Sequence, residues 1–149
     1  MGLADALAPN IANGLRPWRY GAPASANVLR SGYVQPTGVT RLSISANGTP
    51  LSLTGAGIIT YLAYVFPNPG AQTVTLTINL DGAQWTQLVF NSNPSANQWY
   101  LFVGQEGLVT ASAPSPVRLP LRVLSSFSAV ITSWGGVNQA LDYEWMPDF

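Results

Sequence analysis

The chain has 149 residues, a length that suits one domain, and only 8% of them are charged, against roughly 25% in an average soluble domain. Six arginines balance six acidic residues, and histidine, cysteine and lysine are absent. These absences exclude disulfides, histidine or cysteine metal sites, Ser-His-Asp triads, Schiff-base lysines and lysine-bearing phosphate loops.

Neutral polar residues take the place of charge. Serine and threonine number 24 and asparagine and glutamine number 17, against 12 charged residues. A net charge near zero promotes association, so this composition predicts a surface that packs against copies of the chain or against other proteins. An ordinary β domain with few charges is the alternative. Six cations in a chain of zero net charge are a poor electrostatic footprint for nucleic acid, and we expect no nucleic-acid partner.

No segment of the sequence indicates export or membrane insertion. Residues 1–10 lack a basic region, and Asp5 and Pro9 interrupt any apolar run there. The longest apolar stretch, residues 55–66, is shorter than the roughly 20 residues that a membrane-spanning helix needs. We therefore expect no membrane partner and synthesis in a cytoplasm.

Residues 1–38 show neither the period of a helix nor that of a strand, and they contain four prolines and three arginines. Ordering each residue costs about 1–2 kcal/mol of backbone entropy, so this arm needs a surface outside itself. We expect that surface to belong to neighbouring subunits. Trp18 and Tyr20 are the expected anchors, and Arg16 and Arg19 the expected partners of carboxylates or carbonyls.

From residue 39 onward the sequence changes to short strands separated by turn signals. Residues 57–66 are apolar on both faces, whereas residues 72–80 alternate strictly between apolar residues and threonines, as in a half-buried antiparallel strand. Asp81-Gly82 predicts a two-residue hairpin because both residues tolerate the positive φ of that turn. The remaining expected strands are residues 41–46, 51–54, 84–90, 98–103, 107–110, 117–124, 127–133 and 140–145.

Eight or nine short strands without a convincing helix predict an all-β fold. We expect an antiparallel β-sandwich over residues 39–149, jelly-roll-like, preceded by the irregular N-terminal arm. An immunoglobulin-like sandwich is the alternative. Within residues 117–124, Pro120 lacks an amide proton, so that strand should lie at an edge or contain a bulge.

The acidic residues Asp142 and Glu144 are two apart on an expected strand, so they share a face with side chains roughly 7 Å apart. That spacing permits a carboxylate pair for glycoside hydrolysis or part of a calcium site, but an acidic face at the chain end is the simpler interpretation. Four arginines lie within the first 41 residues and three acids within the last eight. These charges could pair head to tail between subunits, or within one chain.

Five tryptophans are many for this length. Trp99 lies beside Gln98 and Tyr100, and Trp134 precedes Gly135, so both are candidates for facing a ligand such as a glycan. The alternative is that tryptophan fills the core or an interface, where its large area makes it an anchor.

The chain resembles small β-sandwich structural proteins of tailed bacteriophages. Four features carry this resemblance: the arm, the apolar strand at residues 57–66, the hairpin at residues 73–82 and the strands from residue 117 to residue 133. This resemblance covers residues 39–145 and implies a non-enzymatic virion component without a cofactor, commonly a homotrimer, that is attached through its arm. A capsid decoration or cement subunit is the first expectation. A tail-tip receptor-binding or carbohydrate-binding module is the alternative, and a small hydrolase using Asp142 or Glu144 is the third.

Overall fold

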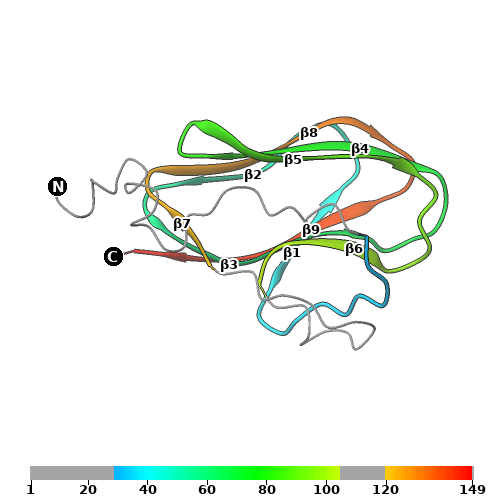
Figure 1. Cartoon of the computed structure of the whole chain (residues 1–149), viewed down its shortest axis with the longest axis horizontal. Coiled ribbons are helices and arrows are strands. Elements are labelled where there is room, and N and C mark those ends of the chain that lie inside the picture. The colour runs from blue at the N-terminus through cyan, green and yellow to red at the C-terminus, as the bar shows by residue number, and fades with distance from the viewer. Residues whose placement is uncertain (1–28, 105–119, 149) are drawn as a thin grey trace.

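The computed structural model describes residues 29–104 and 120–148, in which nine strands form two antiparallel sheets and no helix occurs. The expected strand at residues 107–110 and the first part of residues 117–124 lie outside the described residues. The two sheets pack face to face, as Figure 1 shows. The expected antiparallel β-sandwich is confirmed.

Each sheet has a four-stranded path. Sheet A has the order β1 (Thr40–Ile44), β9 (Gln139–Pro147), β3 (Gly57–Phe66) and β6 (Gln98–Val103), with the short β7 (Leu121–Val123) also paired to β3. Sheet B has the order β2 (Gly48–Thr54), β8 (Ser126–Gly135), β4 (Gln72–Leu80) and β5 (Ala83–Ser92).

The strand pairs are nested in the sequence. β4 pairs with β5, β3 with β6, β2 with β8, and β1 with β9, so each pair encloses the one before it. A long hairpin that is rolled up in this way, with its pairs alternating between two sheets, is a jelly roll. The immunoglobulin-like alternative has a different division of strands between its sheets and does not describe this chain.

Two strands show how burial follows from the sequence pattern. β4 alternates strictly between buried and half-buried residues because one of its faces lies on the core and the other faces outward. β3 is buried over most of its length on both faces. The register of β3 shifts between Ile59 and Tyr61 where it pairs with β9.

The turn at Asp81 and Gly82 joins β4 to β5 as expected, with Leu80 paired to Ala83. Both turn residues have positive φ, 52° and 87°, as a type I′ turn requires. The turn at Asn47 lies between two strands that do not pair with each other, because β1 belongs to sheet A and β2 to sheet B. The Asn47 side chain accepts a hydrogen bond of 2.8 Å from the backbone amide of Trp134.

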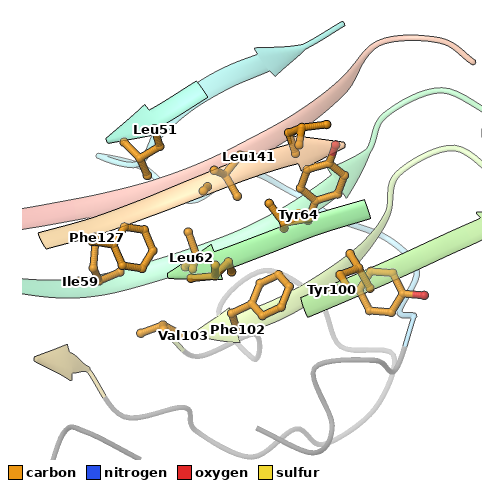
Figure 2. Close-up of a cluster of buried hydrophobic side chains, with 14 of the residues drawn as sticks. Leu51, Ile59, Leu62, Tyr64, Tyr100, Phe102, Val103, Phe127 and Leu141 are labelled. Atoms are coloured by element: carbon orange, nitrogen blue, oxygen red, sulfur yellow. The ribbon is translucent and has the colours of Figure 1, made fainter. Parts of the chain in front are cut away.

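The main core lies between the two sheets, and Figure 2 shows Leu51 and Phe127 of sheet B facing Leu62, Tyr64 and Leu141 of sheet A. All five side chains are at most 5% exposed. Three phenyl or phenol rings meet at the β5–β6 end of this core. The ring centroids of Phe66 and Phe90 are 4.4 Å apart, and Tyr100 contacts both rings edge to face.

Within residues 117–124, the described part confirms the expected alternation, since Leu121 and Val123 are buried and Arg122 between them is half-buried. β7 pairs with β3 alone among the described strands. This position agrees with the expectation that Pro120 marks an edge.

Candidate functional site

Residues 29–39, here called the strap, cross the outer face of sheet A, below the lower sheet in Figure 1. Arg30 and Trp99 exchange two backbone hydrogen bonds, of 2.9 and 3.0 Å, and the Tyr33 amide donates to the Asn97 carbonyl at 2.9 Å. The strap is therefore fastened to the edge of β6. The last ten residues of the expected arm pack on the sandwich of their own chain.

A second apolar cluster lies beneath the strap, on the side of sheet A away from the main core. Trp99 is 0% exposed there, and its ring centroid is 4.9 Å from that of Tyr33. This burial corrects the expectation that Trp99 faces a ligand. The strap covers its ring, and the core interpretation of this tryptophan is the one that the structure supports.

The Asp142 carboxylate is the buried polar centre of this region, with 0% exposure. Arg41 binds it with two hydrogen bonds, from Nε to Oδ1 at 2.8 Å and from Nη2 to Oδ2 at 2.9 Å. The Tyr33 hydroxyl donates to Oδ2 at 2.5 Å, and the Tyr61 hydroxyl donates to that of Tyr33 at 3.3 Å. Arg41 therefore balances the charge of the carboxylate, and side chains of the same chain supply its hydrogen bonds.

The surroundings of Asp142 also change the acidity of its partners. Burial raises the pKa of Tyr33 far above its usual value, and the hydrogen bond to Asp142 raises it further. The hydrogen bond to Asp142 raises the pKa of Arg41. At neutral pH Tyr33 therefore keeps its proton for the hydrogen bond to Asp142, and Arg41 keeps its charge.

Glu144 lies on the same face of β9 as Asp142, as the spacing predicts, because the two residues pair with Tyr61 and Ala63 on the outer face of β3. Thr60 donates a hydrogen bond of 2.6 Å to Glu144. Because the Asp142 carboxylate is hydrogen-bonded to Arg41 and Tyr33, Asp142 and Glu144 do not resemble a free acid and base. Within residues 29–104 and 120–148 no cluster of three histidine, cysteine or acidic side chains could hold a metal ion.

Two ion pairs among the described residues join positions that are distant in the sequence. Arg41 binds Asp142, and Arg122 binds Asp148 through both of its terminal nitrogens. The hydrogen bond from Arg122 raises the pKa of this arginine and lowers that of Asp148. Asp142 and Asp148 thus each pair with an arginine of the same chain, which is one of the two arrangements that the charge distribution allows.

The outer face of sheet B has the opposite character, because the four strands of this sheet contain no charged residue. Its outward side chains bond to one another across strands, from Gln87 to Thr77 at 3.0 Å and from Asn79 to Ser128 at 3.3 Å. We call this surface the polar face of sheet B; its residues are Ser52, Thr54, Thr73, Thr75, Thr77, Asn79, Gln84, Gln87, Val89, Asn91, Ser126, Ser128, Val130 and Thr132.

The tryptophans in the described part of the chain do not lie on this polar face. Trp85, Trp134 and Trp145 are partly buried against the main core, and Trp99 lies beneath the strap. Trp134, the other candidate for facing a ligand, is thus half-buried, and its contact with a ligand stays a prediction. A glycan would not find an aromatic platform among these polar side chains.

The expected assembly contacts Arg16, Trp18, Arg19 and Tyr20 lie outside the described residues. Tyr33 could not be recognised from the sequence as a partner of Asp142, since nothing in the irregular sequence around Tyr33 signals that contact. Within the two described ranges, no helical segment could cross a bilayer.

No family model matches this chain, and no curated protein matches its sequence. The interpretation of its function therefore depends on the sequence and on the two outer faces of the sandwich.

Proposed function

We propose that this chain is a non-enzymatic structural subunit of a bacteriophage virion, a capsid decoration protein that packs against copies of itself and against other virion proteins. The observation that carries the proposal is the polar face of sheet B, to which four strands contribute without a single charged residue.

The chemistry of this face suits burial against another protein. Hydroxyl and amide groups can donate and accept hydrogen bonds, so they can be buried in a contact without leaving an unpaired charge. The centres of protein interfaces are depleted in charged residues, whereas a surface that only faces water usually carries about 25–35% charged residues. The sequence places its described charges in sheet A, in β7 and in loops instead.

The jelly roll is compatible with this role, because viral capsid proteins and lectins both use it. A fold alone does not define a function, so the choice depends on the surface. The polar face of sheet B lacks the tryptophan that would stack on a sugar ring, since the described tryptophans pack elsewhere. This arrangement favours the structural role over the carbohydrate-binding alternative.

The N-terminal arm supplies the proposed attachment. The strap fixes residue 30 to the β6 edge, and residues 1–28 precede the strap in the sequence. They contain Trp18 and Tyr20 as anchors and Arg16 and Arg19 as ionic partners.

Peptide mass spectrometry of virus particles purified from the culture that carries this gene tests the proposal. We expect the chain in the particles at a copy number comparable to that of the major capsid protein. Its presence in the lysate together with its absence from purified particles would refute the virion role.

A substitution tests the polar face itself. Thr75→Lys introduces a charge at its centre and should leave the fold intact while it abolishes binding to particles that lack the protein. Ser43→Lys is the matched control, because Ser43 is an exposed strand residue of sheet A. Equal binding by the two variants would remove the polar face from the proposed contact.

A further inference from the structure

The four strands at the ends of the two sheet paths, β1, β2, β5 and β6, differ in how they are protected against pairing with another chain. β1 has five residues and carries Arg41, and β2 contains Pro50 and a register shift. The edge of β6 is already bonded to Arg30 of the strap. Short length, charge, proline and irregularity are the usual means by which proteins block edge-to-edge association.

β5 lacks most of these protections. It has ten residues without a charge or a proline, and in the described part of the chain it pairs with β4 alone. Its register is irregular only near Trp85, next to the hairpin turn, so residues 86–92 form a regular seven-residue edge. Alternate residues of such an edge direct backbone N–H and C=O groups away from the sheet, where they can pair with another strand.

The side chains of β5 suit a partner with the same sequence. In a two-fold antiparallel pair, like residues lie close together, and like charges opposite each other are destabilising. β5 contains none. Val89 faces outward at 68% exposure, the largest value among the exposed large hydrophobic residues described. A β-branched residue is a favourable member of a cross-strand pair.

We propose that β5 pairs with β5 of a second copy about a two-fold axis, so that two copies of sheet B form one continuous eight-stranded sheet. This contact does not depend on the proposed virion role. It extends the polar face of sheet B across both copies, because antiparallel pairing of equivalent edges keeps both outward faces on the same side.

The position of Val89 makes the contact measurable. Outward side chains of the two copies meet only in registers that pair outward residues with outward residues. In the three such registers centred near Val89, this residue lies opposite Gln87, Val89 or Asn91 of the second copy. Directly opposite Cβ atoms are about 5 Å apart and diagonal ones about 7–8 Å. The two copies of Val89 are therefore near neighbours in each register.

Sedimentation equilibrium over a range of concentrations tests the stoichiometry. Seven residue pairs form a contact smaller than a standard interface of about 800 Å² per partner, so we expect a dimer of micromolar affinity. The mass should rise from 15.8 kDa to twice that value. Val89→Lys should raise the dissociation constant at least tenfold, whereas the control Ser43→Lys should leave it unchanged. A monomer at all concentrations, or the trimer that the bacteriophage resemblance implies, would overturn the proposal.

A spin label tests the geometry independently of any folding defect in the lysine variant. Because the chain has no cysteine, Val89→Cys provides a single labelling site on β5, and Ser43→Cys provides the control on β1. Dipolar broadening should appear at residue 89, grow with concentration, and be absent at residue 43. A dimer without broadening at residue 89 would show that another surface forms the contact.

Discussion

At the scale of single residues, Asp142 shows how a carboxylate is accommodated without contact with water. It has 0% exposure, yet its Oδ1 accepts a hydrogen bond from Arg41, and its Oδ2 accepts one from Arg41 and one from Tyr33. A buried charge is tolerated where its partners satisfy it, and removal of one partner leaves an uncompensated group. The strap is therefore held to sheet A by a polar contact as well as by apolar packing.

Tyr33→Phe removes the hydroxyl from this contact and retains the ring. We expect a loss of about 1.5–3 kcal/mol in the free energy of unfolding at neutral pH, the usual value for a hydrogen bond to a charged group. Tyr61→Phe is the control, because its hydroxyl donates a hydrogen bond to the hydroxyl of Tyr33. Urea denaturation of both variants measures the difference, and equal losses would contradict the central role of Tyr33.

The same variant should change the response to alkaline pH. The pKa of Tyr33 is raised in the folded state from an ordinary value of 10, so its contribution is complete below pH 10 and is lost as the pH rises above that value. Above pH 10 the wild type should lose about 1.4 kcal/mol per pH unit more than Tyr33→Phe. Other tyrosines with raised pKa titrate alike in both proteins, so parallel stability curves would contradict the effect.

Leu76 and Thr75 are neighbours on β4 that face opposite sides of sheet B. Leu76 is 0% exposed in the main core, so Leu76→Ala should lower the free energy of unfolding by about 2–5 kcal/mol. Thr75→Ala should cost much less, because Thr75 lies on the polar face. Comparable losses in denaturant unfolding would mean that this face is covered in the isolated protein.

The sequence predicted some of these residue positions and could not predict others. The period of two placed Asp142 and Glu144 on one face, as the structure confirms. The same period does not tell whether the outer face of sheet A is exposed to solvent or covered by another segment. The strap that buries Trp99 has no regular period, so no periodic signal announces which face it covers.

At the scale of strands, the bounds of β3, β4 and β6 coincide with those predicted from the sequence. Their residues have strong alternation or dense apolar content, and turn residues end them. Which strands pair with each other was harder to predict from the sequence. A turn such as the one at Asn47, between β1 and β2, marks a change of chain direction. Whether the next strand pairs with the previous one or crosses to the other sheet depends on distant residues.

The hairpin between β4 and β5 allows a direct test of turn strain. Gly82 has a φ of +87°, and an added Cβ there would meet no atom within 4 Å. Gly82→Ala should therefore cost about 1–2 kcal/mol through backbone strain alone. Gly135→Ala is the matched control, since its Cβ would make an ordinary contact with Thr73 at 3.8 Å. Thermal or urea unfolding measures both variants, and a neutral Gly82→Ala would disprove the strain.

At the scale of the whole molecule, the strap packs on the sandwich, so the packed domain includes residues before residue 39, where the sequence pattern places its start. Deletion of residues 1–28 should leave a folded protein that no longer joins its particle. Deletion of residues 1–38 also removes Tyr33, exposes Trp99 and leaves Asp142 with one partner fewer, so it should lower the melting temperature sharply. Equal melting of the two truncated proteins would show that the strap adds no stability, and particle binding by the shorter deletion would place attachment in the sandwich.

The nested strand pairs have a consequence for the order of folding. The β4–β5 hairpin closes over two residues, whereas Arg41 and Asp142, which join the ends of the roll, are 101 residues apart in the chain. Loops that long are costly to close early, and folds rich in such contacts fold in milliseconds to seconds. In stopped-flow experiments Gly82→Ala should slow refolding, whereas Tyr33→Phe should leave the refolding rate almost unchanged and accelerate unfolding. The strap would then be the last segment to dock and the first to be released.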